Sequence, residues 1–197
     1  MHRKKINGTR NIVICGVGGQ GIILASDVLC HAAFLSGYDV KKSEVHGMAQ
    51  RGGSVITHVR FGKDVHSPLI EQGTCHYMLA FEKLEALRYT DYLGRDGHII
   101  VDDREIAPMS VLVGDAKYPA DIEQKLQKFG AVHLIDATNI AIDLGNLRVV
   151  NIILLGVLSN FLDLEDRYWQ DAIKQNVKER FAELNVNAFN RGRELTG

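Results

Sequence analysis

Short apolar runs, each followed by turn-forming residues, recur along the chain and predict a series of strands. The run at residues 11–15 ends at a glycine, a pattern typical of a buried strand. Residues 54–61 alternate β-branched and polar side chains, which indicates a half-buried strand before the turn at 62–64. The expected strands lie at residues 11–15, around Val40, and at 54–61, 76–81, 98–101, 110–113 and 132–135.

Between these runs, apolar residues recur at helical spacing and predict helices. In the segment after the first strand they follow one another every three or four positions until Gly37 ends the pattern. Residues 149–162 are apolar almost throughout, but the run is shorter than the roughly 20 residues of a membrane-spanning helix, so we interpret it as a buried core helix. The expected helices lie at residues 20–35, 82–93, 119–129, 140–144, 149–162 and 167–184.

The alternation of strands and helices predicts a doubly wound α/β fold with a mostly parallel, Rossmann-like sheet and helices on both faces. Residues 54–70 predict a small antiparallel insertion in that sheet. We expect a helical C-terminus that packs over one edge of the sheet. A chain of 197 residues has the length of one α/β domain, so we expect residues 1–197 to form a single domain.

Charge and cysteine content narrow the possible functions. The 23 basic and 24 acidic residues leave a net charge of −1, which argues against a surface for nucleic acid or anionic membrane. The 3 cysteines include no CxxC pair and are too few to hold an iron–sulfur cluster by themselves. This sparse cysteine usage, together with a basic N-terminus that is followed by a strand-like segment, predicts a cytoplasmic protein.

A glycine-rich turn with the pattern G-x-G-x-x-G joins the first expected strand to the first expected helix. In the dinucleotide-binding version, Gly16 makes the tight turn, Gly18 lets a ligand approach the backbone and Gly21 packs helix on strand. The acid that usually follows is poorly placed, because Asp39 precedes the second strand and Glu44 lies in the loop behind it. The turn therefore predicts dinucleotide binding, contact with an anion such as a partner's cofactor, or tight packing alone, and anion contact fits best.

Residues 43–53 have no regular periodicity and predict a loop that is rich in candidate binding residues. Arg51 beside Gly52 and Gly53 can present a guanidinium next to exposed backbone amides, which favours an anion site. The same composition also fits a solvated, flexible loop. Turn and loop together provide the candidate cofactor-binding residues Gly16, Gly18, Gly19, Gln20, Gly21, Glu44, His46, Gly47, Arg51, Gly52 and Gly53.

The remaining residues predict neither a catalytic centre nor a metal site. The histidines show no HxxxH, HxH or HExxH spacing, and no nucleophile has an adjacent base. Asp102 and Asp103 follow a strand, where we expect a solvated turn in preference to a metal site of paired carboxylates. Cys15 and Cys30 fall in apolar surroundings, whereas Cys75 is the cysteine that we expect to be exposed.

The glycine turn and the loop together resemble one family. GVGGQG after the first strand, followed by SEVHGMAQRGGSV, resembles the gamma-type subunit or domain of the 2-oxoacid:ferredoxin oxidoreductases. Within that family, the stretch HGMAQ looks most like the beta subunit of indolepyruvate:ferredoxin oxidoreductase. The resemblance runs from Ile12 to about Phe161 and depends mainly on these two motifs.

This resemblance implies an accessory subunit of an enzyme that oxidatively decarboxylates aryl 2-oxoacids, such as indolepyruvate, to acyl-CoA and passes the electrons to ferredoxin. It implies that thiamine diphosphate, Mg²⁺ and [4Fe–4S] clusters belong to a larger catalytic subunit, that coenzyme A is the co-substrate, and that this chain binds no cofactor alone and is inactive alone. The turn and the loop would then lie at or near the junction with that subunit. Without its partner, the chain is expected to self-associate.

Two other hypotheses stay open on the residues alone. A free-standing Rossmann-type dinucleotide-binding protein predicts nucleotide binding by the purified chain, and a small-molecule-binding scaffold predicts neither nucleotide binding nor an obligate partner. The poorly placed acid and the missing catalytic constellation favour the accessory subunit.

Overall fold

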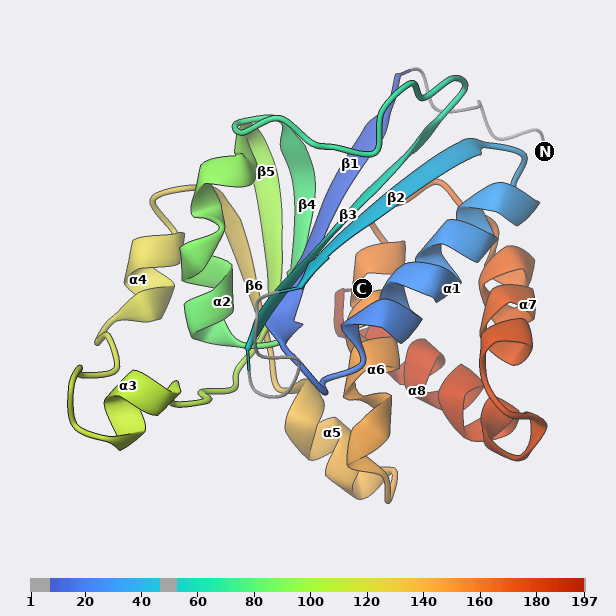
Figure 1. Cartoon of the computed structure of the whole chain (residues 1–197). Helices are drawn as coiled ribbons and strands as arrows, with labels where there is room; N and C mark the ends of the chain where they lie inside the picture. The colour runs from blue at the N-terminus through green and yellow to red at the C-terminus, as the bar shows by residue number, and fades with distance from the viewer. Residues whose placement is uncertain (1–7, 47–52, 197) are drawn as a thin grey trace.

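Six strands form one sheet in the middle of the molecule. The computed structural model describes residues 8–46 and 53–196, and Figure 1 shows the arrangement of their elements. The strands are β1 (Arg10–Val17), β2 (Asp39–His46), β3 (Ser54–Gly62), β4 (Cys75–Ala80), β5 (Leu93–Asp102) and β6 (Ala131–Ile135).

The strand order across the sheet is β2-β3-β1-β4-β5-β6. Strands β1, β4, β5 and β6 are parallel, whereas β3 is antiparallel to both of its neighbours, β1 and β2. Because two antiparallel steps restore the direction, β2 points the same way as β1. Every strand except β3 therefore ends at the same border of the sheet, which we call the carboxyl edge.

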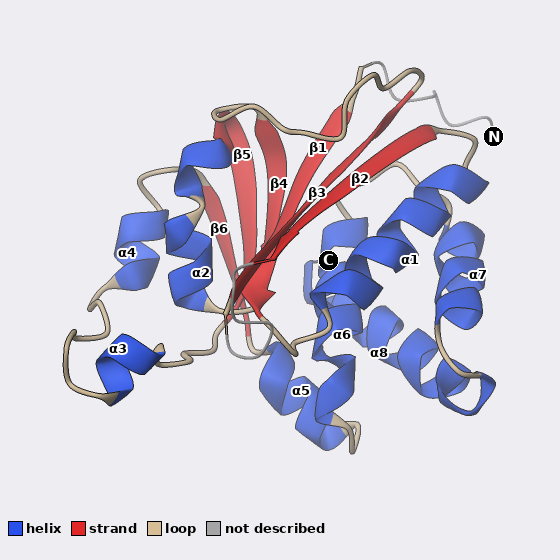
Figure 2. Ribbon diagram, viewed as in Figure 1, coloured by secondary structure: helices blue, strands red, loops and turns tan. Residues whose placement is uncertain are grey.

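Helices cover both faces of the sheet (Figure 2). Helices α2 and α4 pack on one face, α1 and α6 pack on the other, and α7 and α8 form an outer layer against α1 and α6. The helices are α1 (Ile22–Leu35), α2 (Lys83–Arg88), α3 (Met109–Leu112), α4 (Ile122–Leu126), α5 (Ala137–Asp143), α6 (Val150–Ser159), α7 (Asp166–Asn176) and α8 (Ala182–Arg193). Short 3₁₀ turns are η1 (Thr90–Tyr92), η2 (Leu147–Val149), η3 (Glu179–Phe181) and η4 (Glu194–Thr196).

The alternation of side chains along the strands builds one apolar core on each face. On β1, Val13 faces the core under α2 and α4, and its neighbour Ile14 faces the core under α1 and α6. Every residue of α6 is buried, because this helix lies between the sheet and α8. The predicted mostly parallel α/β fold and the predicted buried helix are both confirmed.

Two predictions at the carboxyl side were wrong. Residues 110–113 form part of α3 and its C-terminal cap and not a strand, because β5 pairs directly with β6 and leaves no position between them. Residues 43–46 continue β2 and do not belong to a loop, because β3 offers a pairing partner up to His46. Glu44 is therefore a strand residue.

The C-terminal segment also differs from its prediction. The expected helix at 167–184 is interrupted at Val177, whose extended backbone separates α7 from α8. The two helices pack on α1 and α6 and not over an edge of the sheet, and Trp169 lies 5.4 Å from Phe189 between ring centroids. The expected helix at 82–93 ends at Arg88, since β5 already begins at Leu93.

None of the helices within residues 8–46 and 53–196 has the length and apolar character needed to cross a lipid bilayer.

Two glycines allow α6 and α8 to approach closely. A Cβ atom at Gly156 would lie 2.2 Å from the carbonyl oxygen of Phe189, and one at Gly192 would lie 2.0 Å from the carbonyl oxygen of Ile153. Real Cβ atoms do not approach backbone oxygens this closely. Any side chain at either position would therefore push the two helices apart.

We expect Gly156→Ala to lower the free energy of unfolding by about 1–3 kcal/mol, because overpacking forces backbone shifts in a dense core. Urea unfolding followed by circular dichroism measures this change. Asn187→Ala, on the exposed side of α8, serves as the control and should leave the midpoint nearly unchanged. Equal midpoints for both variants would contradict close packing of α6 on α8.

Candidate functional site

The carboxyl edge brings together the glycine turn, the last residues of β2, the start of β3 and the first turn of α2 (Figure 1). Ligands of open α/β sheets bind beyond the carboxyl ends of the strands, so this edge is the candidate site. The amide of Gly18 donates to the carbonyl oxygen of Gly53 at 2.8 Å. The turn and the C-terminal end of the candidate loop are thus in direct contact.

Two glycines of the turn adopt backbone angles that favour glycine. Gly19 has φ +103° and Gly21 has φ +83°, both in the left-handed region. A Cβ atom at Gly21 would also lie 2.6 Å from the side-chain nitrogen of Asn151. Of the two, Gly21 belongs to the G-x-G-x-x-G pattern, which therefore reflects a real backbone requirement at that position, whereas Gly19 is an additional glycine of the turn.

The side chain of Gln20 braces the turn. Its Oε1 accepts a hydrogen bond from the amide of Val17 at 2.7 Å, and its Nε2 donates to the carbonyl oxygen of Phe81 at 2.8 Å. A Cβ atom at Gly16 would lie 2.7 Å from this Oε1 and 2.9 Å from the Cβ of Phe81. Gly16 and Gln20 thus join the ends of β1 and β4 and stiffen the turn from within.

The first turn of α1 keeps backbone amides available. The first amide bonded within the helix is that of Ala25, which donates to the carbonyl oxygen of Gly21 at 3.1 Å. No side chain of the described residues caps the helix, and its first turn carries no acid. Unpaired amides at the start of a helix of this length attract an anion.

A dinucleotide fits this arrangement poorly. In the dinucleotide-binding fold, the ribose-binding acid follows the strand next to β1, but here the antiparallel strand β3 separates β1 from β2. Asp39 is at the far end of β2, where its carboxylate accepts from the amide of Val65 at 2.9 Å. Glu44 lies 2.6 Å from the ammonium of Lys42, which also pairs with Asp27 at 2.5 Å. Burial disfavours the charged form of Lys42, but these two carboxylates outweigh that effect and raise its pKa.

The structure therefore brings Gly16, Gly18, Gly19, Gln20, Gly21 and Gly53 together at the carboxyl edge. Glu44 and His46 approach this edge on β2, where His46 pairs with Val55 in the strand register. Gly47, Arg51 and Gly52 lie outside the described residues.

A polar cluster around the buried Glu85, next to Gly53, was missed by sequence reasoning. The Ser54 hydroxyl donates to the Glu85 carboxylate and lies 2.8 Å from the Tyr89 hydroxyl, while Arg88 Nε donates to Glu85 Oε1 at 3.1 Å. Burial raises the pKa of Tyr89. This cluster anchors the start of β3 to α2, and only the spacing of Glu85, Arg88 and Tyr89 along one helix hinted at it.

Glu82 is a second buried carboxylate at this edge, and it accepts hydrogen bonds from other groups of the protein. It caps α2 by accepting from the amide of Glu85 at 2.8 Å, and it also accepts from the amide of Ile106 at 3.2 Å and from the Tyr118 hydroxyl. Burial, followed by the bond to Glu82, raises the pKa of Tyr118. Glu82 therefore acts as a structural anchor for the segment after β5.

The expectation of a solvated turn at Asp102 is wrong. Asp102 is fully buried and accepts from the amide of Ala137 at 3.1 Å and from the Thr138 hydroxyl at 2.9 Å, which fixes the start of α5. Burial raises the pKa of Asp102, and the bonds from Thr138 and Ala137 oppose that shift. Asp103 pairs with Lys83 at 2.8 Å. The two adjacent carboxylates thus have separate structural partners.

The cysteines and histidines do not converge on a site. Within the described part of the chain, no group of three histidine, cysteine or acidic residues could hold a metal ion. Cys75, expected to be exposed, is fully buried, because it begins β4 on the face covered by α2. His58 accepts from the amide of Ile70 at 3.1 Å, and burial lowers its pKa. His98 and His133 lie 3.1 Å apart in the middle of the neighbouring strands β5 and β6.

We expect Gln20→Ala to speed hydrogen exchange at the Val17 amide at least about fivefold, because this amide loses its acceptor and the loss of one hydrogen bond is worth about 1 kcal/mol or more. Gln20→Glu keeps the acceptor and should protect Val17 better than Gln20→Ala. NMR-detected hydrogen exchange measures both variants, with Gln175→Ala, at an exposed position of α7, as the control. Unchanged exchange in Gln20→Ala would show that the brace does not hold the turn.

Known proteins resemble this chain along almost its whole length. The family model for pyruvate ferredoxin/flavodoxin oxidoreductase matches residues 11–195. Indolepyruvate oxidoreductase subunit IorB of Thermococcus kodakarensis is 40% identical over 188 residues, which cover 92% of this chain and 93% of that protein. The 2-oxoglutarate synthase subunit KorC of Methanothermobacter thermautotrophicus is 30% identical over 191 residues, with 94% of each chain covered.

Solved structures agree with this similarity. The gamma subunit of a keto/oxoacid ferredoxin oxidoreductase from Geobacter sulfurreducens has a TM-score of 0.71 and 26% identity, covering 94% of this chain and 97% of that one. The 2-oxoglutarate:ferredoxin oxidoreductase from Magnetococcus marinus, at 21% identity and a TM-score of 0.73, shares the fold over 98% of this chain and 31% of its own. The resemblance predicted from the two sequence motifs is confirmed, and the chain belongs to the pyruvate ferredoxin/flavodoxin oxidoreductase family.

Proposed function

We propose that this chain is the small accessory subunit of an enzyme that oxidatively decarboxylates aryl 2-oxoacids, such as indolepyruvate, to acyl-CoA with ferredoxin as the electron acceptor. The observation that carries the proposal is the end-to-end match to proteins named indolepyruvate oxidoreductase subunit IorB. Their identity to this chain is 35–40%, against 26–30% for the subunits of 2-oxoglutarate and pyruvate/ketoisovalerate enzymes. This difference supports an aryl 2-oxoacid as the substrate class.

We assign thiamine diphosphate, Mg²⁺ and the [4Fe–4S] clusters to a larger catalytic subunit. The thiols of this chain are poor cluster ligands, because burial raises the pKa of Cys30 and of Cys75 to about 12 and raises that of Cys15 well above its usual value. A cluster needs thiolates, and these groups stay protonated near neutral pH. Three free cysteines also suit a reducing cytoplasm.

The proposed role of the carboxyl edge is to complete the site on that larger subunit. The free amides at the start of α1 and the Arg51 guanidinium can both bind an anion, and coenzyme A and thiamine diphosphate are both anionic. The carboxylates Glu82, Glu85 and Asp102 are held by protein donors at this edge. The described residues of the edge therefore supply binding groups and no free acid or base. We propose that the whole chain, residues 1–197, acts as one gamma-type unit in this way.

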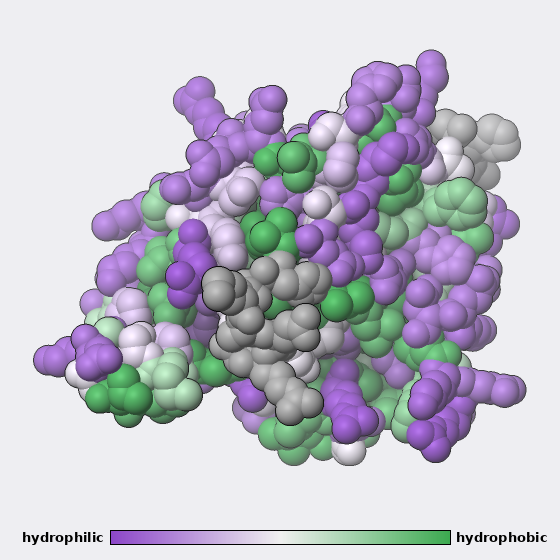
Figure 3. All heavy atoms as spheres, in the orientation of Figure 1, coloured by the Kyte–Doolittle hydropathy of each residue, from purple (hydrophilic) through white to green (hydrophobic). Residues whose placement is uncertain are grey.

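An exposed apolar patch on α3 supports docking at the same edge. Met109, Leu112 and Val113 are 71%, 67% and 61% exposed, respectively. Apolar atoms gather at the protrusion that carries α3 (Figure 3). Large apolar side chains in such a cluster mark a protein-binding surface. The segment follows the carboxyl end of β5, so a partner that covers the carboxyl edge can also cover α3.

Affinity purification of the tagged chain from its own cells tests the proposal. We expect a larger subunit at a fixed stoichiometry, carrying iron and thiamine diphosphate, and an eluate that reduces a viologen dye when indolepyruvate and coenzyme A are added. Recovery of the chain alone, with no dye reduction by the eluate, would contradict the proposal.

We expect Arg51→Ala to raise the Michaelis constant for coenzyme A about tenfold or to weaken assembly, because a charge-assisted hydrogen bond is worth about 1.5–3 kcal/mol. Steady-state kinetics of the purified complex measures the first effect and gel filtration the second. Arg95→Ala removes an exposed arginine at the start of β5, far from the carboxyl edge, and is the matched control. If Arg51→Ala and Arg95→Ala behave alike in both assays, Arg51 has no part in the site.

We expect Leu112→Asp to weaken association with the larger subunit about 30-fold, because a charge in an apolar contact costs about 2 kcal/mol. Leu69→Asp is the control, since Leu69 is also exposed, at 57%, but lies in the β3–β4 connection. Biolayer interferometry with the immobilised larger subunit compares the two. Equal affinity of the two variants would argue against α3 as a docking surface.

A further inference from the structure

A pocket of about 320 Å³ lies between the first turn of α1, the 3₁₀ turn η2 and the junction of α7 with α8. Its volume is within the range of small-molecule sites. Leu24, Val149, Val177 and Phe181 form apolar walls. Apart from the first turn of α1, which carries Leu24, the function proposed above makes no use of the residues that line this pocket.

Three cations line the same pocket: Arg148, Lys178 and Arg180. All three are exposed, and none makes an ion pair with a carboxylate in the described part of the chain. No acidic residue is among the described residues that line it. The three positive charges around this pocket repel each other, and an anion bound between them would relieve that repulsion.

Hydrogen bonds within the chain hold the frame of the pocket in place. Asn176 Nδ2 donates to the carbonyl oxygen of Ala172 at 2.8 Å, and Asn185 Nδ2 donates to that of Phe181 at 2.8 Å. On the opposite side, Asn146 Oδ1 accepts from the amide of Arg148 at 3.0 Å. The backbone that carries the cations is thus fixed before any ligand arrives, which lowers the entropy cost of binding.

A contact between Arg180 and Phe181 links the charged residues of the pocket to its apolar wall. The guanidinium of Arg180 lies 4.7 Å from the centroid of the Phe181 ring, a cation–π distance. A ligand ring placed on Val177 and Phe181 would therefore hold an attached anionic group beside Arg180. An anion without an apolar body would leave these walls uncovered.

We propose that this pocket binds a small organic phosphate whose ring-sized apolar body lies against Val177 and Phe181 and whose phosphate lies among Arg148, Lys178 and Arg180. A phosphate monoester carries close to two negative charges near neutral pH, and it suits three cations better than a single carboxylate does. Arginine binds phosphate oxygens in a bidentate manner, which adds direction to the charge attraction.

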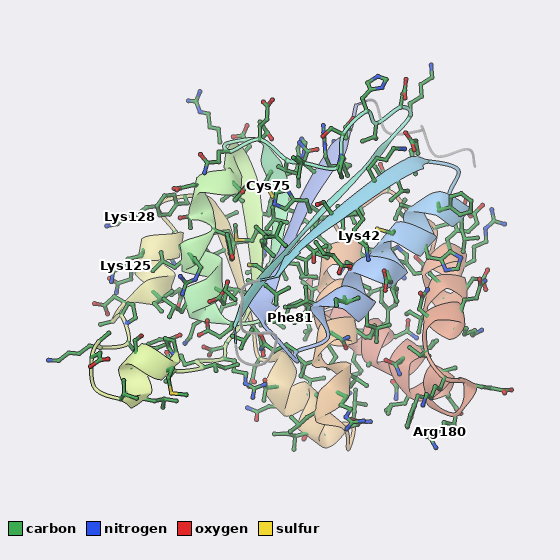
Figure 4. The ribbon with its side chains drawn as sticks, in the orientation of Figure 1. Lys42, Cys75, Phe81, Lys125, Lys128 and Arg180 are labelled. Atoms are coloured by element: carbon green, nitrogen blue, oxygen red, sulfur yellow. The ribbon has the colours of Figure 1, made fainter. Side chains whose placement is uncertain are left out.

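Calorimetric titration of the full chain with phenyl phosphate, inorganic phosphate and phenol tests this inference. We expect phenyl phosphate to bind at least about tenfold more tightly than either of the others, because only it offers both the ring and the charge. We expect the double variant Arg148→Ala with Arg180→Ala to lose at least about tenfold in affinity for phenyl phosphate. Lys128→Ala is the control, because Lys128 extends from the α4 side of the molecule and Arg180 from the α7–α8 side (Figure 4).

Three results would overturn the inference: no binding of phenyl phosphate at millimolar concentration, equal affinity for phenyl phosphate and either of the other compounds, or equal loss in the double variant and in Lys128→Ala. The titration contains no partner subunit and no 2-oxoacid. Its outcome is therefore independent of the accessory-subunit function proposed above.

Discussion

The wholly buried helix α6 is the element on which the rest of this structure depends. It packs against β4 and β5 on one side and α8 on the other, with α1 and α5 beside it. Gly156 lets α8 approach within a distance that no side chain would permit. Near its start, Asn151 donates to the carbonyl oxygen of Gly21 at 3.1 Å. One helix thus holds the outer helical layer and also fixes the glycine turn.

At the carboxyl edge, the protein uses its buried polar groups to hold its own segments together. Glu82, Glu85 and Asp102 each bind donors from a different element, and Gln20 ties two strand ends. Such hydrogen-bonded carboxylates are costly to disturb, because removing a donor leaves a buried polar group unsatisfied. The edge then offers backbone amides and exposed apolar side chains, which suits the proposed role of completing a partner's site.

Several parts of the fold follow from local patterns. The run before Gly16, the glycine turn and the periodicity of the next helix describe β1, the turn and α1, because each depends on neighbours within a few residues. The apolar run at 149–162 describes α6 for the same reason. In contrast, the apolar residues 110–113 resemble a strand, and only the direct pairing of β5 with β6 shows that the sheet has no place for one.

The candidate site, like the fold, was predicted only in part from the sequence. The glycine spacing and the loop composition were enough to indicate the family, because each motif is a short stretch of neighbouring residues. Only the tertiary structure showed that β3 separates β1 from β2, that Glu44 pairs with Lys42, and that Ser54 meets Glu85. The contact of Ser54 with Glu85 joins residues far apart in the chain, and the position of β3 depends on how the strands are ordered. Glu44 meets Lys42 because β2 continues through both residues and places their side chains on one face. A single sequence determines local conformation and the burial of long apolar runs, whereas packing decides the burial of single residues such as Cys75 and which distant polar groups satisfy one another.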